Sequence, residues 1–449
     1  MARRKIREYD TKRILAEHFG HYSQGKIKLS FQSILIDPET NIEELSLKYP
    51  WLLEQKLVIK PDQLFGKRGK LGLVLLDASF EQVKEYLHSR RNKEVTIGKA
   101  RDKLTHFIIE PYVAHAKEFY VAILPQRGLD NIIFSDRYGG IDVESHKAEM
   151  HIWPVTLGVN TTLAQNNAFL EQSFDRFFDF YDERFAARPG SEKDQAMSSE
   201  EKEKIKLFLK TLYHLFLELE FTYLELNPFT IMPNGEISIL GAVASVDGCA
   251  LFQQEKRWQL DSFPTPFGRR ISPEENYITE LNEKSGGSLK LTVLNPQGRI
   301  WNIFSGGGAS VILLDSLVAC GAGQEIANYG EYSGNPTREE SYHYAKTILD
   351  LMTREKNLQG KILLIGGAIA NFTDVEKTFQ GIADALIEQG DKLKEQAISM
   401  HVRRGGPNYK KGLELIKQAG EKIGISCNVY GPETEMTFIA ALAGENVRR

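Results

Sequence analysis

The sequence is poor in cysteine and has no long apolar run. Its 449 residues include three cysteines, Cys249, Cys320 and Cys427, which are scattered and lie outside any CxxC or Cys/His spacing. An odd, scattered set predicts free thiols rather than a disulfide framework or a zinc site. Since no uninterrupted apolar stretch approaches the roughly 20 residues of a membrane span, we expect no membrane protein.

The charge is nearly balanced, which excludes further classes of partner. There are 56 Lys and Arg residues against 60 Asp and Glu residues, for a formal net charge of -4. This balance argues against a general binder of nucleic acid or of membrane surfaces. The basic start, residues 2–5, is followed by charged residues rather than by the apolar segment of a signal peptide. We therefore expect a cytoplasmic protein.

Length and composition predict two or three domains with sizeable cores, since 42% of the residues are hydrophobic. The stretch Phe263-Pro-Thr-Pro-Phe-Gly268 interrupts all periodicity. We predict a first domain at 1–262, a connector at 263–287 and a second domain at 288–449. Within the first domain the patterns predict helices at 11–19, 80–88, 169–185 and 202–219, a strand at 28–35 and a glycine turn at 139–144.

A glycine-rich turn at 304–310 has the pattern of a strand, a tight turn and a helix. Apolar residues precede the triplet Gly306-Gly-Gly308, and apolar residues at helical spacing follow it. Free amides and the positive end of the helix dipole converge at such a turn, which favours an anion site. Taken alone, the triplet would favour a tight turn without a ligand.

Two further turns of the same kind favour the anion site. Residues 361–374 run from an apolar strand through small residues to a capping box that begins at Thr373, and residues 398–408 contain Arg403 and Arg404. In a parallel sheet such turns share one edge, where open α/β sheets bind ligands. Either arginine could bind a carboxylate through two hydrogen bonds, and for either one alone a solvated surface position is the alternative.

The first half contains a candidate magnesium-nucleotide site. Lys60 ends an apolar run, and a basic, glycine-rich loop follows at 66–72. Such a loop can hold a polyphosphate, but it lacks the GxxxxGK[ST] pattern, and a basic surface hairpin explains it about as well. Further along, Glu225, Asn227 and Asp247 supply the oxygen ligands that Mg²⁺ takes.

The motifs together resemble the ATP-citrate lyase family over nearly the whole chain. They are VIKPDQL (58–64), KRGKLGL (67–73), IEPYV (109–113), EFYV (118–121), GGIDVE (139–144), YLELNP (223–228), SLKLTVLNPQGRIW (288–301), GGGASV (306–311), NYGEYSGNP (328–336), YAKTILDLMTREK (344–356), GGAIANFTDV (366–375) and VRRGGPNY (402–409). The resemblance implies an α/β protein: an ATP-grasp domain followed by a flavodoxin- or Rossmann-like parallel-sheet domain that binds citrate. This portion of the family is also similar to the β subunit of succinyl-CoA synthetase.

The family's reaction implies a partner subunit. By resemblance, ATP phosphorylates a histidine, the phosphate passes to citrate, and citryl-CoA forms and is cleaved to acetyl-CoA and oxaloacetate. None of the ten histidines lies in the Gly-His-Ala-Gly-like setting of the accepting residue. We therefore expect no catalytic residue in this chain. We expect a hetero-oligomer in which a synthetase α-like, citrate-synthase-like subunit supplies the histidine and most contacts to CoA. The alternatives are a citryl-CoA synthetase subunit and a citrate-binding regulatory subunit.

The resemblance also implies site residues. The ATP-binding positions are Lys60, Arg68, Gly69, Pro111, Val113 and Glu118, and the citrate-binding positions are Gly334, Asn371, Thr373 and Arg404. Asn227 stands at a magnesium position, but Gly241 stands where the family has a magnesium-binding aspartate. Either Asp247 or Glu225 replaces that ligand, or the ATP site is impaired.

Overall fold

The chain forms two compact units, Met1–Arg269 and Arg270–Arg449. The structure is a computed structural model that describes residues 3–98, 100–136, 150–156 and 197–448. The turn predicted at 139–144 and the helix predicted at 169–185 lie outside the described residues. Each unit has its own hydrophobic core and is described separately.

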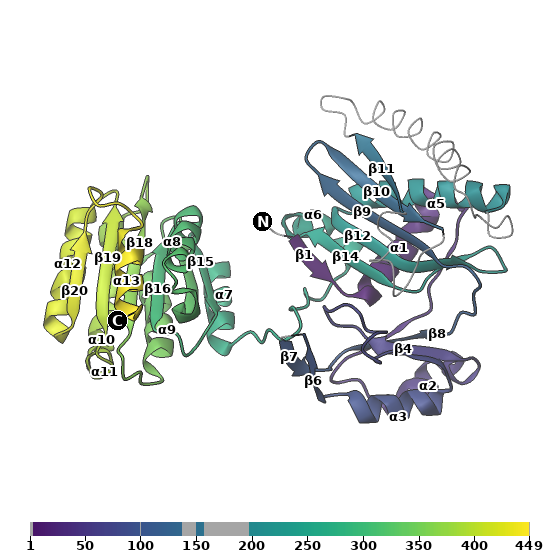
Figure 1. The fold of residues 1–449 in the computed structure, drawn as a ribbon, viewed down its shortest axis with the longest axis horizontal. Coiled ribbons are helices and arrows are strands. Elements are labelled where there is room, and N and C mark those ends of the chain that lie inside the picture. Colours follow the sequence, from purple (N-terminus) through teal and green to yellow (C-terminus); the bar gives the residue numbers. More distant parts are fainter. Residues whose placement is uncertain (1–2, 99, 137–149, 157–196, 449) are drawn as a thin grey trace. The chain divides into compact units, whose positions relative to one another are not determined.

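A large, mainly antiparallel sheet forms one lobe of the first unit (Figure 1). Its strands follow the order β1 (Arg3–Ile6), β14 (Ala242–Asp247), β12 (Phe221–Ile231), β9 (Phe119–Gln126), β10 (Leu129–Ser135) and β11 (His151–Thr156), and β13 (Ile237–Ile239) and β2 (Leu29–Ser30) extend it beside β12. The helices α1 (Glu8–Tyr22), α5 (Ser199–Glu218), η5 (Gly248–Ala250) and α6 (Leu251–Trp258) contribute to the hydrophobic core of the same lobe.

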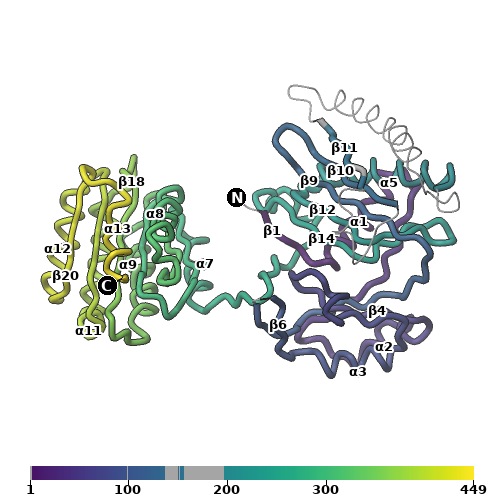
Figure 2. The backbone as a smooth tube through the Cα atoms, in the orientation of Figure 1, coloured from purple at the N-terminus to yellow at the C-terminus, as the bar shows by residue number. Residues whose placement is uncertain are grey.

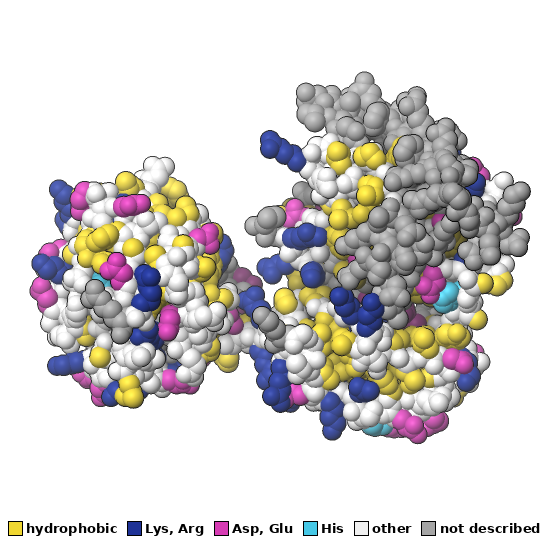
Figure 3. Space-filling model, viewed as in Figure 1, with side chains coloured by type: hydrophobic (Ala, Val, Ile, Leu, Met, Phe, Trp, Pro, Cys, Tyr) yellow, Lys and Arg dark blue, Asp and Glu magenta, His cyan; other side chains and the backbone are white. Residues whose placement is uncertain are grey.

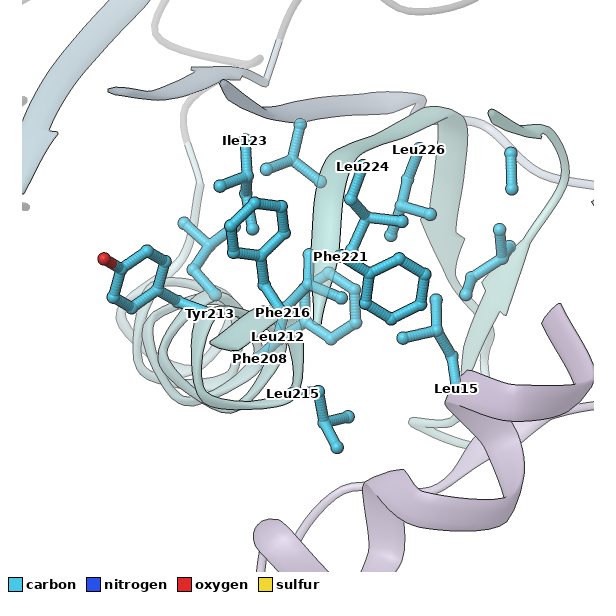
Figure 4. Close-up of a cluster of buried hydrophobic side chains, with 14 of the residues drawn as sticks. Leu15, Ile123, Phe208, Leu212, Tyr213, Leu215, Phe216, Phe221, Leu224 and Leu226 are labelled. Carbon is cyan, nitrogen blue, oxygen red and sulfur yellow. The ribbon is translucent and has the colours of Figure 1, made fainter. Parts of the chain in front are cut away.

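Helix α5 covers this sheet because its apolar residues recur at helical spacing. A capping box of Ser198 and Glu201 starts the helix. Its buried side chains, Phe208, Leu212, Leu215 and Phe216 among them, pack with Leu15 of α1 and with β12 residues such as Leu224 and Leu226 (Figure 4). Each such side chain stabilises the fold by about 1.5–3 kcal/mol relative to leaving it exposed. The helix predicted at 202–219 is therefore confirmed.

A smaller antiparallel sheet with its own hydrophobic core forms the second lobe of this unit. Its order is β3 (Ile34–Ile36), β8 (Phe107–Pro111), β4 (Leu57–Pro61) and β5 (Leu75–Ala78), with α3 (Phe80–Arg90), α2 (Leu45–Lys48), η1 (Ile42–Glu44), η2 (Pro50–Leu53) and the hairpin β6 (Glu94–Ile97) and β7 (Ala100–Lys103) nearby. Figure 2 shows the chain passing from β1 through α1 to β4 and later returning to the large sheet. The strand predicted at 28–35 is divided, since β2 pairs in the large sheet and β3 in the small one.

The second unit is built on one six-stranded sheet. Its order is β15 (Ser288–Val293), β17 (Asn328–Ser333), β16 (Ile300–Ser305), β18 (Ile362–Ile369), β19 (Ser399–Gly405) and β20 (Ser426–Tyr430). Only β15 runs antiparallel to its neighbour, so the expected parallel sheet is confirmed. The helices are α7 (Pro273–Lys284), α8 (Gly307–Ala319), η6 (Gly323–Glu325), α9 (Arg338–Thr353), α10 (Val375–Glu388), α11 (Gly390–Glu395), α12 (Tyr409–Ile423) and α13 (Phe438–Arg448).

Two separate cores show that helices cover both faces of this sheet. Helices α8 and α13 pack around Leu313 and Ile439 on one face. Helices α9, α10 and α12 pack around Ile348, Phe379 and Ile416 on the other. The connection after β16 thus goes to one face and the connection after β18 to the opposite face. Between these neighbouring strands lies the switch point at which open α/β sheets bind ligands.

Among the side chains that Figure 3 colours, hydrophobic groups lie next to acidic and basic ones on each unit. The three cysteines are free thiols, as predicted. Among the helices in the described ranges, none has both the length and the apolar character needed to cross a bilayer.

Candidate functional site

A cluster of buried charges joins the two lobes of the first unit. Glu8 lies in the first turn of α1, on the side of the large sheet, and is 4% exposed. Lys60 lies on β4 of the small sheet, and Arg68 follows in the loop after it. Glu110 lies on β8, beside β4. The cluster therefore brings together two predicted ATP-binding residues and two carboxylates.

Short ion pairs link these residues. The Lys60 Nζ lies 2.6 Å from Glu8 Oε1 and 3.2 Å from Glu110 Oε2. Lys12, one turn after Glu8, lies 2.8 Å from both carboxylates. The Arg68 guanidinium donates to the Glu8 carboxylate and, at 2.9 Å, to the Pro61 carbonyl. Both lysines also donate to the Leu240 carbonyl, at 2.5 Å from Lys60 and 3.2 Å from Lys12. A buried charge needs such partners, because an unpaired one is very costly.

The cluster sets the protonation of its members. Burial disfavours the Glu8 carboxylate, but Arg68, Lys12 and Lys60 together hold its pKa well below the usual range. Burial also disfavours the charged form of Lys12, yet Glu110 and Glu8 outweigh this and raise its pKa. For Lys60 burial prevails, and its pKa is lowered despite Glu8 and Glu110.

Asp62 fixes the start of α1 beside this cluster. Its carboxylate accepts hydrogen bonds from the backbone amides of Glu8 at 2.9 Å and Tyr9 at 3.0 Å. A carboxylate at this position satisfies free amides of the first turn and interacts favourably with the helix dipole. The end of β4 thereby sets the position of Glu8.

The other predicted ATP-binding residues lie along the same small sheet and its exit. Pro111 ends β8 and is opposite Leu57, three residues from Lys60 along β4. At about 3.3 Å per residue this is roughly 10 Å, a spacing that allows one extended nucleotide to contact both. Val113 and Glu118 follow β8, where the His115 ring contacts the Val113 carbonyl at 2.7 Å and the Glu118 carboxylate at 3.0 Å. Gly69 lies in the exposed loop with Arg68.

Strand register separates the candidate magnesium ligands. Asn227 and Glu225 lie two residues apart on the same face of β12, and the side-chain amide of Asn227 donates to the Glu225 carboxylate at 3.3 Å. Asn227 pairs with Gly241 through its backbone, whereas Asp247 lies six residues further, at the other end of β14. That separation is about 20 Å, which argues against Asp247 as a ligand of an ion held by Asn227. Among the described residues, no group of three or more His, Cys, Asp or Glu side chains could hold a metal.

Gly241 is closed to any side chain. A Cβ atom at this position would lie 2.2 Å from the Asn227 carbonyl oxygen. The glycine therefore permits the close approach of β14 to β12, and in this backbone no carboxylate can extend from position 241.

The second candidate site lies at the carboxyl edge of the parallel sheet. Gly306 precedes α8 with a φ of 91°, and no side chain caps this helix. Gly334 follows β17 with a φ of 75°. The Thr373 hydroxyl donates to the Gly334 carbonyl, and the Asp374 amide donates to Asn335 at 3.3 Å. These bonds join the loops after β17 and β18 across the end of β16.

The capping box predicted at Thr373 is wrong. Helix α10 begins at Val375, and Asp374 caps it by accepting from the Lys377 amide at 3.2 Å. Thr373 precedes the cap, which leaves its hydroxyl to bind Gly334. Asn371 is exposed in the same loop.

The two arginines of β19 differ in their partners. Arg403 is satisfied by three backbone carbonyls, those of Thr434 at 3.0 Å, Gly367 at 2.9 Å and Pro432 at 3.2 Å. Arg404 is 3% exposed, donates one bond of 2.5 Å to the Ala368 carbonyl, and has an Nε with no partner. Burial lowers the pKa of Arg404, and Tyr332 acts in the opposite direction. A buried guanidinium with an unused donor is suited to a carboxylate ligand.

Sequence reasoning missed Glu8 and Lys12. The spacing of Glu8 and Lys12, one helical turn apart, is ordinary for a solvated helix face. The sequence signal that could have found them is that Glu8 and Lys12 lie on the same helix face as the buried residues Leu15 and Phe19.

Two family models match the chain. Residues 2–176 match the ATP-grasp domain of ATP-citrate synthase, and residues 269–446 match the citrate-binding region of ATP citrate lyase. The chain is 42% identical to ATP-citrate synthase alpha chain protein 2 of Arabidopsis thaliana over 98% of this chain and 97% of that protein. It is 41% identical to ATP-citrate synthase of Mus musculus over 99% of this chain, which spans only 38% of the mouse protein.

Two solved structures are similar over their whole length. ATP citrate lyase from Methanothrix soehngenii, in complex with citrate and coenzyme A, gives a TM-score of 0.82 at 45% identity, covering 99% of this chain and 100% of that one. A variant of Methanosaeta concilii ATP citrate lyase, in complex with (3S)-citryl-CoA, gives 0.81 at 44% identity, covering 98% and 99%.

Proposed function

The chain belongs to the ATP-citrate lyase family, and on this premise we propose that it is the subunit that binds ATP with Mg²⁺ and citrate to form citryl-CoA. We assign residues 1–262 to the ATP-grasp domain and residues 288–449 to the citrate-binding domain, with 263–287 between them. Within the connector 263–287, helix α7 packs Ile278 into the core of the second unit.

Arg404 is the observation that carries the citrate proposal. It is a buried guanidinium on β19, beside β18 at the switch point of the parallel sheet, and one of its donors is unused. Gly334, Asn371 and Thr373 lie in the two loops that are linked nearby. A tricarboxylate offers several anionic oxygens, so the guanidinium, an exposed amide and free backbone amides could bind it together.

The charge cluster supports the ATP proposal. Lys60 and Arg68 would neutralise phosphate oxygens, while Gly69, Pro111, Val113 and Glu118 lie in segments that follow the same small sheet. Asn227 and Glu225 fit Mg²⁺ as one amide and one carboxylate, because Mg²⁺ in such sites takes one or two carboxylates together with phosphates and waters. The ion would supply charge neutralisation for the phosphates.

The complete reaction needs a partner subunit. We infer that a synthetase α-like, citrate-synthase-like chain supplies the histidine that accepts the phosphate, most contacts to CoA and the cleavage of citryl-CoA to acetyl-CoA and oxaloacetate. The solved relatives hold citrate with coenzyme A, or citryl-CoA, which supports this assignment of substrates. If the partner lacks a citrate-synthase-like module, the complex is a citryl-CoA synthetase instead.

Gly241 favours a second candidate function, a citrate-binding regulatory subunit with an impaired ATP site. The backbone leaves no room for a carboxylate at this magnesium position. Calorimetry of the full chain with ATP and Mg²⁺ separates the two functions. Binding of ATP supports the enzyme subunit, and its absence supports the regulatory subunit.

The citrate proposal is tested by Arg404→Ala. Loss of one side of a buried charge-assisted pair costs about 2–5 kcal/mol, which is roughly 30- to 5000-fold in affinity. We expect calorimetry to show this loss for citrate and little change for ATP. Arg404→Lys should recover only part of the affinity, because an ammonium cannot donate two parallel bonds. Arg354→Ala, at an exposed arginine of the same unit, is the matched control. Unchanged citrate affinity in Arg404→Ala would contradict the proposal.

A further inference from the structure

The Lys60 ammonium group is closely surrounded by oxygen atoms of the protein. An ammonium group has three hydrogens, and three oxygens surround this one: Leu240 O at 2.5 Å, Glu8 Oε1 at 2.6 Å and Glu110 Oε2 at 3.2 Å. A nucleotide phosphate that approaches Lys60 therefore competes with these oxygens for the ammonium group.

Glu110 is the partner that Lys60 can most readily exchange. Its contact with Lys60 is the longest of the three. Glu8 is fixed at the start of α1 through its amide, and the Leu240 oxygen belongs to the backbone. Glu110 also keeps other partners without Lys60, since Lys12 donates to both of its oxygens at 2.8 Å and the Ser33 hydroxyl donates to it at 2.9 Å.

We propose that Glu110 competes with the phosphates of the nucleotide for Lys60, and that Lys12 is the positioning residue that holds Glu110 when Lys60 turns to the nucleotide. The inference rests on the proposed ATP site of the first unit. It assigns to Lys12 a function in nucleotide binding without any contact to the nucleotide.

The charge balance predicts opposite changes in ATP affinity for the loss of the Glu110 charge and the loss of the Lys12 charge. Three cations, Lys12, Lys60 and Arg68, face two carboxylates, Glu8 and Glu110. The Asp62 carboxylate beside them is offset by the Arg7 guanidinium, so one positive charge remains for an anion. Loss of the Glu110 charge would increase this excess and free Lys60. Loss of Lys12 would abolish the excess and leave Lys60 as the main partner of Glu110. A merely structural function would weaken binding in both cases.

The test compares Glu110→Gln with Lys12→Met in the full chain, using calorimetry with ATP and Mg²⁺ and, separately, with citrate. We expect Glu110→Gln to bind ATP about tenfold more tightly and Lys12→Met to bind it about tenfold more weakly, a change of about 1.4 kcal/mol in each direction. Citrate affinity should stay the same. Lys12→Arg, which keeps the charge, should bind ATP nearly as the wild type does.

Two exposed ion pairs supply matched controls. Glu17→Gln removes a carboxylate from α1, and Lys28→Met removes an exposed lysine; both should leave ATP affinity unchanged. Weaker or unchanged ATP binding in Glu110→Gln would overturn the inference while the proposed ATP site stands. A wild-type chain that binds no ATP would overturn the ATP site itself and the inference with it. If Lys12→Met does not fold, the sign of the Glu110→Gln effect decides.

Discussion

Asp62 shows at the residue scale how burial changes one carboxyl group. Burial and the neighbouring Glu8 carboxylate raise the pKa of Asp62 to about 6, although Arg68 and two backbone amides act against them. An aspartate in an unfolded chain has a pKa of about 3.9. Between these two values the folded protein binds more protons at Asp62 than the unfolded chain, so this group's contribution to stability is lost as the pH rises from about 4 to 6.

The corresponding prediction concerns Asp62→Asn. A shift of two pKa units corresponds to about 3 kcal/mol. The integrated linkage places about 2 kcal/mol of this change between pH 4 and pH 6. We expect the stability of the wild type relative to the variant to fall by that amount across this range, measured by urea unfolding at each pH. The amide keeps an oxygen for the first turn of α1, so its remaining effect should not depend on pH. A constant difference across this range would show that Asp62 is ionised throughout.

At the scale of elements, side chains complete the pairing of β16 with β17. These parallel strands pair at only two positions, Phe304 with Glu331 and Ser305 with Tyr332. Earlier in both strands, the fully buried side chains of Asn302 and Asn328 replace the missing backbone hydrogen bonds. The backbone amide of Asn302 donates to the Asn328 side chain at 2.9 Å, and the backbone amide of Gly330 donates to the Asn302 side chain at 2.8 Å. The two asparagines therefore position the strand that leads to Gly334.

Asn302→Ala should accordingly destabilise the second unit. It leaves the buried Gly330 amide without an acceptor, and each such group costs about 1–3 kcal/mol. We expect a lower midpoint of thermal unfolding for this unit and weaker binding of citrate. Asn357→Ala, in an exposed turn, should change stability by less than about 0.5 kcal/mol. If the two variants unfold at the same temperature, the asparagine pair does not stabilise the strands.

At the scale of the whole molecule, the two units have separate cores. A ligand that binds only one folded unit stabilises that unit by mass action, about 2.7 kcal/mol at a hundred times the dissociation constant. We expect ATP with Mg²⁺ to slow amide hydrogen exchange in residues 1–269 of the full chain, and citrate to slow it in residues 270–449. Protection of both units by citrate alone would show that they are coupled energetically.

The sequence by itself determined the local features of this protein. Periodicity and glycine turns predicted the parallel sheet of the second unit, and the helix at 202–219, because strands and helices depend on residues close together in the chain. The motifs led to the family, and with it to Lys60, Arg68 and Arg404 as candidate ligands. These candidates stay predictions, since a motif gives residue types and not their contacts.

Only the tertiary structure decided which residues meet. Glu110 joins Lys12 from 98 positions away, and the Thr373 hydroxyl binds Gly334 from 39 positions away instead of capping a helix. Strand register separated Asp247 from Asn227, and the approach of β14 to β12 closed position 241. Each outcome depends on packing between segments far apart in the chain, which local sequence patterns do not specify.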